Sequence, residues 1–279
     1  MQAELTRWFK QNKRDLPWRD TSPWGVMVSE FMLQQTPVNR VLPIWNQWMR
    51  TWPDPHSLAQ APKPDVIRAW GRLGYPRRAL RLHESAKVIS EKFGNQVPST
   101  YEELLSLPGI GDYTASAILA FAYSQRSLVL DINIRRFFSR SIDGVETPPA
   151  SISQVERALR TELIPSKRPH VWAAATMEFG ALVCTAKNPN CADCPLQGQC
   201  AWRAAGYPKS EAKPKPTFNG SDRQCRGAIL NVLREQSRAS FQELSLLWPD
   251  SPQFEKGLKT LIADGLIETT GKKSYKLAN

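Results

Sequence analysis

Four cysteines crowded between residues 184 and 200 constrain the fold of this 279-residue chain more than any other feature. Their spacing is Cys184-x6-Cys191-x2-Cys194-x5-Cys200. Thiolates this close in sequence can converge on one tetrahedral centre, and the spacing alone suits a zinc ion and a four-iron cluster equally well. A centre held by four thiolates has no open position for substrate, so its role would be structural. We expect the remaining cysteine, Cys225, to be a free thiol.

Composition and charge favour a soluble protein that binds a polyanion. The odd cysteine count of 5 suits a metal centre in a reducing compartment better than a disulfide framework. No apolar run approaches the ~18–20 residues that span a bilayer, and residues 1–7 lack the apolar core of a signal peptide. We therefore expect a cytoplasmic protein without membrane contact, associated with the nucleoid if its source is bacterial. The net charge of +11 is typical of nucleic-acid binders, and most of the excess lies before residue 217.

Apolar residues recur at helical spacing almost throughout, so the pattern predicts a mainly α-helical fold. No convincing run of strands precedes residue 220. Residues 204–221 are rich in proline and lysine and are predicted to be a linker. The tail pattern predicts helices and then a hairpin, at residues 225–235, 241–247, 253–264, 266–269 and 274–277. This order resembles a winged-helix module, which would either contact DNA or serve in packing and protein contacts.

Glu30 is the most informative single residue in the chain. On a helix, Val26, Met27 and Leu33 would surround its carboxyl with apolar side chains. Removal from water favours the protonated form, and a carboxylic acid that keeps its proton near neutral pH can act as a general acid. The alternative is a core glutamate paired with an arginine or a backbone amide.

Two further segments are candidates for contact with a sugar or a phosphate. Asp131 follows the apolar run Leu128–Leu130 at the predicted start of a helix, where it would cap the helix and could also stabilise a cationic sugar. Leu107–Gly111 is a glycine turn predicted to join two helices. Its glycines permit left-handed backbone and let N–H groups approach a phosphate, although an ordinary turn between helices has the same pattern.

Taken together, these motifs resemble the adenine DNA glycosylases of the MutY family. The matching segments follow the family's order: Leu16–Arg19 (LPWR), Val28–Thr36 (VSEFMLQQT), Leu73–Tyr75 (LGY), Leu107–Ala115 (LPGIGDYTA), Asp131 with Asn133, and the cysteine spacing. The resemblance covers about residues 4–203, and it is specific because all the motifs occur jointly.

The resemblance implies a two-lobed helix-hairpin-helix DNA glycosylase fold with a DNA-facing cleft between the lobes. Residues 1–21 with 131–203 would form one lobe and hold a [4Fe–4S] cluster on the four cysteines. Residues 22–130 would form a six-helix lobe with the helix-hairpin-helix. The linker at residues 204–221 would then lead to the winged-helix-like domain at residues 222–279.

The resemblance also implies a reaction. Glu30 would protonate N7 of an adenine extruded from the duplex, and Asp131 would stabilise the oxocarbenium-like sugar left by cleavage of the N-glycosidic bond. Asn133 and Tyr113 would position these groups and the attacking water. Related endonuclease III-like enzymes carry a lysine at position 113 that forms a Schiff base and nicks the strand. Tyr113 has no amine, so the expected enzyme is monofunctional.

The implied partner is duplex DNA with adenine opposite 8-oxoguanine or guanine, bound by a monomer. Residues implied to contact DNA are Arg19, Leu33, Gln35, Tyr75, Gly109 and Gly111. Gln35 and Tyr75 would wedge into the base stack beside the lesion.

The sequence departs from the family pattern in three places. Pro76 stands where many relatives have a second tyrosine, and Ile132 where a glycine commonly follows the aspartate. The Nudix-like C-terminal domain that reads 8-oxoguanine has no counterpart in the tail, so discrimination between the two opposite bases is left open. Two other functions also stay open: a glycosylase for another mismatched base, such as thymine opposite guanine, and a non-catalytic protein that binds DNA structure.

Overall fold

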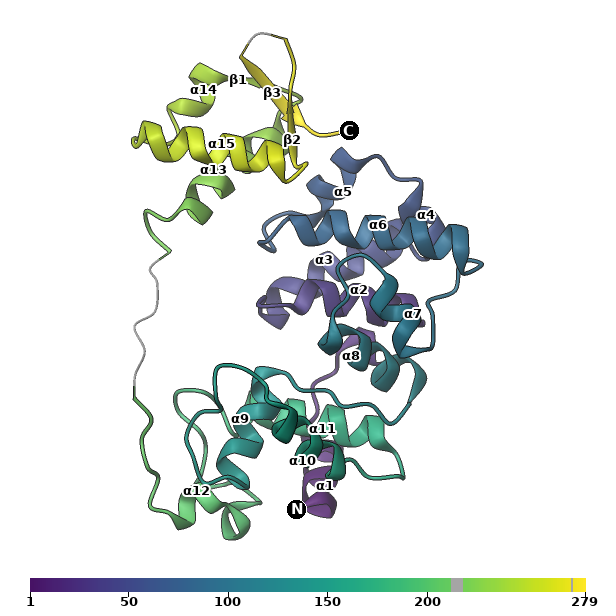
Figure 1. The fold of residues 1–279 in the computed structure, drawn as a ribbon, viewed down its shortest axis with the longest axis vertical. Helices are drawn as coiled ribbons and strands as arrows, with labels where there is room; N and C mark the ends of the chain where they lie inside the picture. The colour runs from purple at the N-terminus through teal and green to yellow at the C-terminus, as the bar shows by residue number, and fades with distance from the viewer. Residues whose placement is uncertain (212–217, 272) are drawn as a thin grey trace. The chain divides into compact units, whose positions relative to one another are not determined.

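The computed structural model describes residues 1–211, 218–271 and 273–279. The fold is mainly helical, as predicted (Figure 1). The chain divides into two compact units. Unit 1 comprises Met1–Met27, Ser99–Ser106 and the described part of Ile110–Lys213. Unit 2 comprises Val28–Pro98, Leu107–Gly109 and the described residues from 218 onward.

Unit 1 is built from helices. They are α1 (Gln2–Asn12), α7 (Tyr101–Ser106), α8 (Asp112–Tyr123), α9 (Ile132–Ser141), α10 (Gln154–Glu162), α11 (Pro169–Leu182) and α12 (Ala201–Ala204), with 3-10 turns at Pro17–Arg19 and Gln197–Gln199. Helix α2 (Pro23–Leu33) runs across the division between the units.

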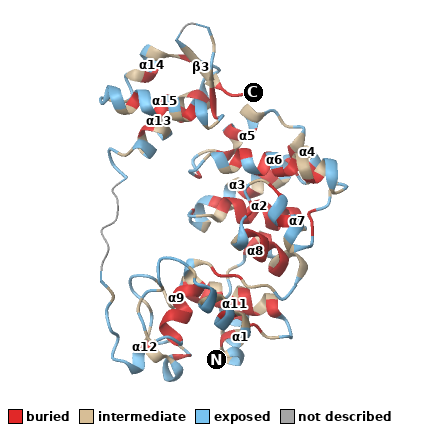
Figure 2. Ribbon diagram, in the orientation of Figure 1, coloured by how far each residue is buried: buried red, intermediate tan, exposed pale blue. Residues whose placement is uncertain are grey.

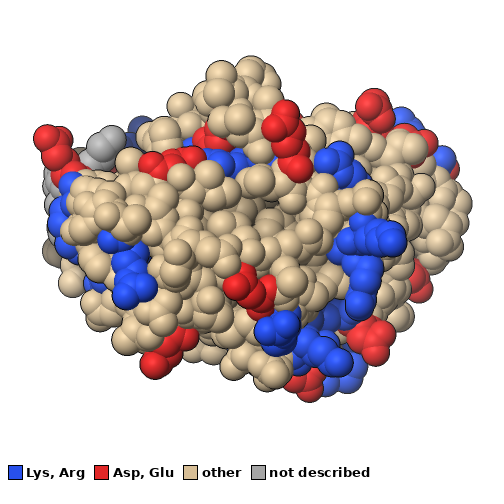
Figure 3. All heavy atoms as spheres, turned by 90° about the horizontal axis from the view of Figure 1, so that it is seen from below, with Lys and Arg blue, Asp and Glu red and all other residues tan. Residues whose placement is uncertain are grey.

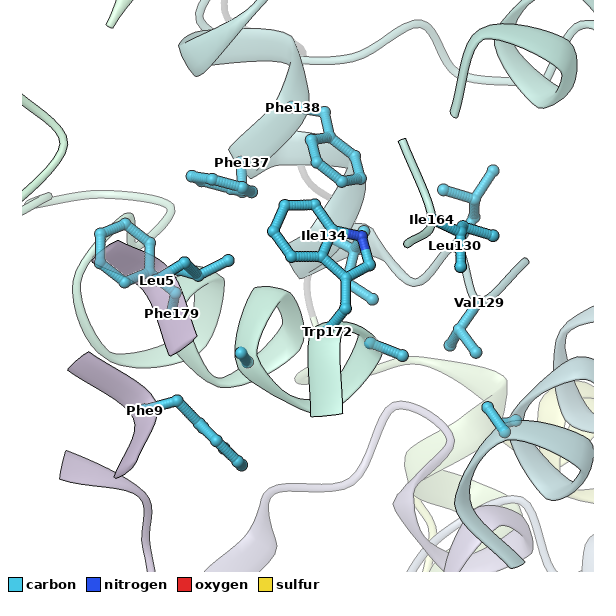
Figure 4. Close-up of a cluster of buried hydrophobic side chains, with 14 of the residues drawn as sticks. Leu5, Phe9, Val129, Leu130, Ile134, Phe137, Phe138, Ile164, Trp172 and Phe179 are labelled. Atoms are coloured by element: carbon cyan, nitrogen blue, oxygen red, sulfur yellow. The ribbon is translucent and has the colours of Figure 1, made fainter. Parts of the chain in front are cut away.

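The core of unit 1 joins the N-terminal helix to α9 and α11 (Figure 4). The Trp8 ring meets the edge of Phe179 with centroids 4.9 Å apart, and Phe137 meets Phe179 at 5.3 Å. Ala117 and Ala120 of α8 belong to the same buried cluster. Helix α8 therefore lies in unit 1, although the predicted boundary placed it in the six-helix lobe of residues 22–130.

Unit 2 contains helices and a small sheet. Its elements are α3 (Val38–Thr51), α4 (Pro55–Ala59), α5 (Lys63–Trp70), α6 (Arg77–Lys92), α13 (Asp222–Glu235), β1 (Ala239–Ser240), α14 (Phe241–Ser245), α15 (Ser251–Ala263), β2 (Ile267–Thr269) and β3 (Ser274–Leu277). Figure 2 shows the buried faces of these helices in red.

The described residues from 218 onward form the predicted winged-helix-like pattern. The sheet is antiparallel in the order β1-β3-β2, with Ala239 opposite Tyr275 and Ile267 opposite Leu277. The predicted helices and hairpin strands agree with the structure to within about three residues at each end. Strand β1 was not predicted because its 2 residues carry no alternating pattern.

This module shares a core with helices α5 and α6. Ile67 and Leu80 belong to the same buried cluster as Ile229 and Leu233 of α13. An ion pair of 3.3 Å from Arg77 to Asp264 of the module adds to this contact. The module was predicted as a separate domain, but it shares this buried cluster with α5 and α6 and belongs to unit 2.

Residues 212–217 of the predicted linker, and Lys272 in the predicted hairpin, lie outside the described residues. Within the described residues, no helix is both long and apolar enough to cross a membrane. Figure 3 shows one face of the molecule, where Lys and Arg side chains form separate groups with acidic residues between them.

Candidate active site and metal centre

Glu30 lies in α2 with 5% of its surface exposed. Val26 and Met27, one turn earlier, are 4% and 0% exposed. The carboxyl is therefore buried on an apolar face, as its sequence position predicts. A carboxyl in such surroundings is either protonated or closely paired, because water no longer solvates its charge.

Asp131 is the N-cap of α9, as predicted. Its Oδ1 accepts a hydrogen bond from the Ile134 N–H at 2.7 Å, and its Oδ2 accepts one from Asn133 Nδ2 at 2.7 Å. Burial raises the pKa of Asp131, while these hydrogen bonds and the charge of Arg136 oppose the rise. Ile132, one of the departures from the family pattern, is 60% exposed. The site thus contains a half-buried carboxyl whose two oxygens each accept a hydrogen bond.

A chain of hydrogen bonds connects Asp131 to the cysteine segment. Asn133 donates to Asp131 and accepts at Oδ1 from Arg136 Nη2 at 2.9 Å. Arg136 also donates from Nε to the carbonyl of Cys184 at 2.8 Å. Gly180 makes this packing possible, since an added Cβ would lie 2.5 Å from the carbonyl oxygen of Asn133. The orientation of Asp131 therefore depends on how the cysteine segment packs.

Tyr113 lies in the first turn of α8, half-buried against the core of unit 1. Its neighbour Asp112 accepts hydrogen bonds from Tyr101 Oη at 2.9 Å and from Arg157 Nη2 at 2.5 Å. These bonds fix the start of the helix. The side chain at position 113 is a phenol, which cannot form a Schiff base.

Gln35 and Tyr75 lie in two exposed loops with left-handed backbone. Their φ angles are 54° and 46°. Such angles cost about 1–3 kcal/mol for a residue with a side chain, and they cluster where proteins bind ligands. Gly74 has a φ of 82°, and Pro76 is the N-cap of α6. The backbone of the Tyr75 loop is thus held in a tight turn.

Arg78 of α6 ties the two loops together. One terminal nitrogen donates to the Gln34 carbonyl at 2.6 Å, and the other donates to the Gly74 carbonyl at 3.1 Å and to Thr36 Oγ1 at 3.2 Å. Its guanidinium lies 5.4 Å from the centroid of the Tyr75 ring. Burial lowers the pKa of Arg78 to about 10, so the side chain stays charged at neutral pH. Sequence reasoning missed this residue because it lies in a basic run typical of an exposed helix.

The hairpin between α7 and α8 needs a glycine at only one of its two predicted positions. Gly109 has a φ of 82°, and an added Cβ would lie 2.7 Å from Arg81 Cβ and 3.1 Å from Phe31 Cε1. Gly111 has a φ of −115° and open space where a Cβ would be. The steric constraint therefore falls on Gly109.

Leu33 and Arg19, the other two residues predicted to contact DNA, are both partly covered by the protein. Leu33 is half-buried at the end of α2. Arg19 Nη2 lies 3.0 Å from the carboxylate of Glu178, which Arg14 also holds at 2.7 Å. Glu178 is buried, and no sequence pattern pointed to it as a partner for Arg19. The DNA contact of Arg19 stays a prediction.

The four clustered cysteines line one cavity. The cysteines that surround it are Cys184, Cys191, Cys194 and Cys200. Across the described ranges, no group of three metal-ligating side chains is close enough to hold a metal ion. Four thiols around one cavity suit a metal centre held by thiolates. Burial raises the pKa of the Cys194 thiol to about 11, so this ligand needs a metal's charge to stay ionised at neutral pH.

Arg140 brings a buried positive charge to the same cavity. Its Nη1 lies 3.6 Å from Cys184 Sγ and donates to the Thr185 carbonyl at 2.7 Å. Its guanidinium lies 4.7 Å from the centroid of the Trp202 ring. A cation fixed beside thiolate ligands lowers the electrostatic cost of gathering their charges.

Comparison with known proteins gives two family matches. The HhH-GPD superfamily base excision DNA repair protein matches residues 28–163, and the iron-sulfur binding domain of endonuclease III matches residues 184–200. The adenine DNA glycosylase of Mycobacterium tuberculosis (strain ATCC 25618 / H37Rv) is 46% identical over 275 residues, which cover 96% of this chain and 90% of that protein. The chain belongs to the adenine DNA glycosylase family.

Other adenine DNA glycosylases match over different lengths. That of Mycolicibacterium smegmatis is 44% identical and covers 99% of this chain and 95% of that protein. The human protein is 39% identical over 213 residues, which cover 72% of this chain and 39% of the human protein. The matches to the mycobacterial proteins cover nearly all of this chain and therefore include its C-terminal module.

Solved structures confirm the fold class that was predicted for this chain. A thermostable thymine-DNA glycosylase superposes with a TM-score of 0.66 at 24% identity, covering 73% of this chain and 94% of that one. An endonuclease III bound non-covalently to DNA superposes with a TM-score of 0.63 at 20% identity. At these identities the likeness establishes the fold.

The iron-sulfur match decides between the two metal centres that the cysteine spacing left open. It begins at Cys184 and ends at Cys200, the outer pair of the four. The prediction of a [4Fe–4S] cluster is thereby confirmed over zinc. The four cysteines that line the cavity would hold the cluster.

Purified protein is therefore expected to be yellow-brown and to contain about four iron atoms per chain. Replacing Cys194 with serine should remove the colour, because a serine hydroxyl does not replace a thiolate. The matched control, Cys225→Ser, changes a buried cysteine of the C-terminal module and should keep the colour. Elemental analysis that finds one zinc and no iron would contradict this expectation.

Proposed function

We propose that this protein is a monofunctional base excision repair enzyme that hydrolyses the N-glycosidic bond of adenine opposite 8-oxoguanine or guanine in duplex DNA. Its family membership supports the reaction and the base. The observation that carries the proposal is the pair of carboxyl groups, Glu30 buried in α2 and Asp131 fixed at the start of α9. A protein that only bound phosphates would gain nothing from two carboxylates. The proposal requires both groups to act on the same nucleotide.

Glu30 is proposed to be the general acid. Adenine is a poor leaving group as an anion, and protonation at N7 lets it leave neutral. A carboxyl that is 5% exposed is removed from competing water, which favours the protonated form that the donor role requires.

Asp131 is proposed to stabilise the sugar after the base departs. Cleavage leaves an oxocarbenium-like cation, and a nearby carboxylate lowers the free energy of that state. The hydrogen bonds from Ile134 and Asn133 hold both oxygens, so little reorganisation is needed when the charge develops. Asn133 is itself held by Arg136, and this makes it a positioning residue. We propose that Tyr113 helps to position the attacking water.

Gln35 and Tyr75 are proposed to enter the base stack when the adenine is extruded. An enzyme cannot reach the glycosidic bond of a stacked purine, so it must unstack the nucleotide and fill the space that is left. Both residues are exposed, both have left-handed backbone, and Arg78 holds both loops. The hairpin with Gly109 is proposed to bind the DNA backbone through its N–H groups.

The Tyr113→Lys variant tests the monofunctional assignment. A lysine at this position could attack the sugar C1′ with its amine and form a Schiff base, which leads to strand cleavage. We expect borohydride to trap a covalent DNA adduct with this variant and none with the wild type. Base excision without any adduct would mean that position 113 does not decide whether the strand is cut.

The proposed substrate is tested with a panel of duplexes under single-turnover conditions. The duplexes carry A:8-oxoG, A:G, T:G or an abasic site, and strand breaks are scored with and without alkali. The expected result is base loss from both adenine mispairs and strand breaks only after alkali. Excision from T:G alone would favour the thymine alternative, and binding without excision of any base would favour a non-catalytic protein.

A further inference from the structure

The C-terminal module touches the side chain that is proposed to wedge into DNA. Arg223, in the first turn of α13, donates from Nη1 to Tyr75 Oη at 2.9 Å. Its guanidinium lies 5.8 Å from the centroid of the Tyr75 ring. The exposed ring is thus bonded at its hydroxyl end, although 44% of the residue is accessible.

Two arginines from different elements hold the same ring. Arg78 of α6 lies 5.4 Å from the ring centroid and bonds the Gly74 carbonyl just before Tyr75. Arg78 therefore fixes the backbone of the loop, while Arg223 fixes the far end of the side chain. A ring that has one hydrogen bond and two adjacent guanidinium groups loses much of its rotational freedom before DNA arrives.

Helix α13 is a firm support for Arg223. It begins at the Ser221 cap and buries Ile229 and Leu233 in the cluster that contains Ile67 and Leu80. Polar contacts between the module and the loop region reinforce this packing. They are the 3.1 Å hydrogen bond from Arg72 to Asn231 and the 3.3 Å ion pair of Arg77 with Asp264, whose other oxygen pairs with Arg226 inside the module at 2.5 Å. The module is therefore anchored within a few residues of Tyr75.

We propose that Arg223 is a positioning residue for Tyr75, through which the C-terminal module sets the conformation of the DNA wedge. This inference rests on the proposed function, because it assigns Arg223 a role only if Tyr75 enters the base stack. It gives the C-terminal module a part in extrusion of the adenine. Deletion of the module does not test it, because deletion would also expose the shared apolar core.

The test uses point variants of the full-length protein: Arg223→Ala, Arg223→Lys, Tyr75→Phe, Tyr75→Ala and the double variant Arg223→Ala/Tyr75→Phe. The control, Lys256→Ala, removes one positive charge from the same module, at a side chain that is 66% exposed and pairs with Asp222. The substrate is an A:G duplex with 2-aminopurine beside the mispaired adenine, because its fluorescence rises when the stack is opened. For the fluorescence measurement the mispaired adenine nucleotide carries a 2′-fluorine, which disfavours the cationic sugar and holds the complex before cleavage. The single-turnover rate is measured on the same duplex without the fluorine.

Arg223→Ala is expected to lower the fluorescence rise and to lower the single-turnover rate at saturating DNA by about 3–10-fold, which corresponds to loss of one hydrogen bond. Arg223→Lys should recover part of both signals. The double variant should be no slower than Arg223→Ala, because both changes remove the same bond. Lys256→Ala should change neither signal once the DNA is saturating.

Two different failures can be told apart. If Tyr75→Ala leaves the fluorescence rise and the rate unchanged, Tyr75 is not a wedge and that part of the proposed function is wrong. If Tyr75→Ala lowers both signals while Arg223→Ala gives the same fluorescence rise and rate as the control Lys256→Ala, only the positioning role of Arg223 is overturned. A double variant whose losses are additive would likewise show that Arg223 does not act through the hydroxyl of Tyr75.

Discussion

Replacing Glu30 with glutamine is expected to lower the rate of adenine excision by about 10²–10⁴-fold, the usual contribution of a positioned general acid. Glutamine has nearly the same shape, so α2 should fold and DNA affinity should stay close to that of the wild type. The amide cannot donate a proton to N7, and the base would then have to leave as an anion. The rate should be measured in single turnover at saturating A:8-oxoG duplex, with affinity measured separately.

Glu84→Gln is the matched control for this variant. Glu84 makes an ion pair with Arg81 on an exposed part of α6, where its side chain is 47% exposed. The same chemical change there should leave the excision rate within about twofold of the wild type, because surface ion pairs contribute little. A Glu30→Gln enzyme that excises adenine at nearly the wild-type rate would return Glu30 to the core-glutamate alternative.

Asp131→Asn is expected to lower the excision rate by about 10²-fold or more, because the cationic sugar loses its counter-charge. Asparagine can still cap α9, so a large loss of activity would not come from loss of the helix. Asp65→Asn, which removes an exposed carboxylate from the first turn of α5, is the matched control. A mild effect at Asp131 would leave this residue with its capping role alone.

The same variant should also change how stability depends on pH. Burial raises the folded-state pKa of Asp131 above its ordinary value of 3.8, so ionisation costs the native state free energy. This cost is absent below the unfolded-state pKa, sets in as the pH rises above about 4, and is complete above the folded-state pKa. The midpoint of thermal unfolding of Asp131→Asn, relative to wild type, should therefore be higher at pH 8 than at pH 4. A difference that stays constant or falls would contradict a raised pKa.

Local patterns in the sequence predicted several features of the site. Glu30 is buried because its neighbours at helical spacing are apolar, and Asp131 caps a helix because it follows an apolar run. The helices and hairpin of the C-terminal module follow from their own periodicity. Each of these features depends on residues within one or two helical turns of each other, so it can be predicted from a single sequence.

Features that depend on residues far apart in sequence were not predicted. Arg78 and Arg223 lie in polar segments whose composition is typical of exposed helices. Only the tertiary fold brings the two side chains to Tyr75. The ion pair of Arg19 with Glu178, about 160 residues away in the sequence, was also not predicted. The shared core that fixes the module against α5 and α6 is likewise invisible to periodicity, which shows that a face is apolar without showing what covers it.

Identification of the released base tests the central claim most directly. Wild-type protein is incubated with an A:8-oxoG duplex that has been purified from free nucleotides. The small-molecule fraction is analysed by mass spectrometry, and the lengths of the DNA strands are measured before and after alkali treatment. Hydrolysis by Glu30 and Asp131 predicts free adenine in the same molar amount as abasic strand, with strands intact until alkali is added. Release of no base, release of a different base, or strand breaks formed in equal amount without alkali would contradict it.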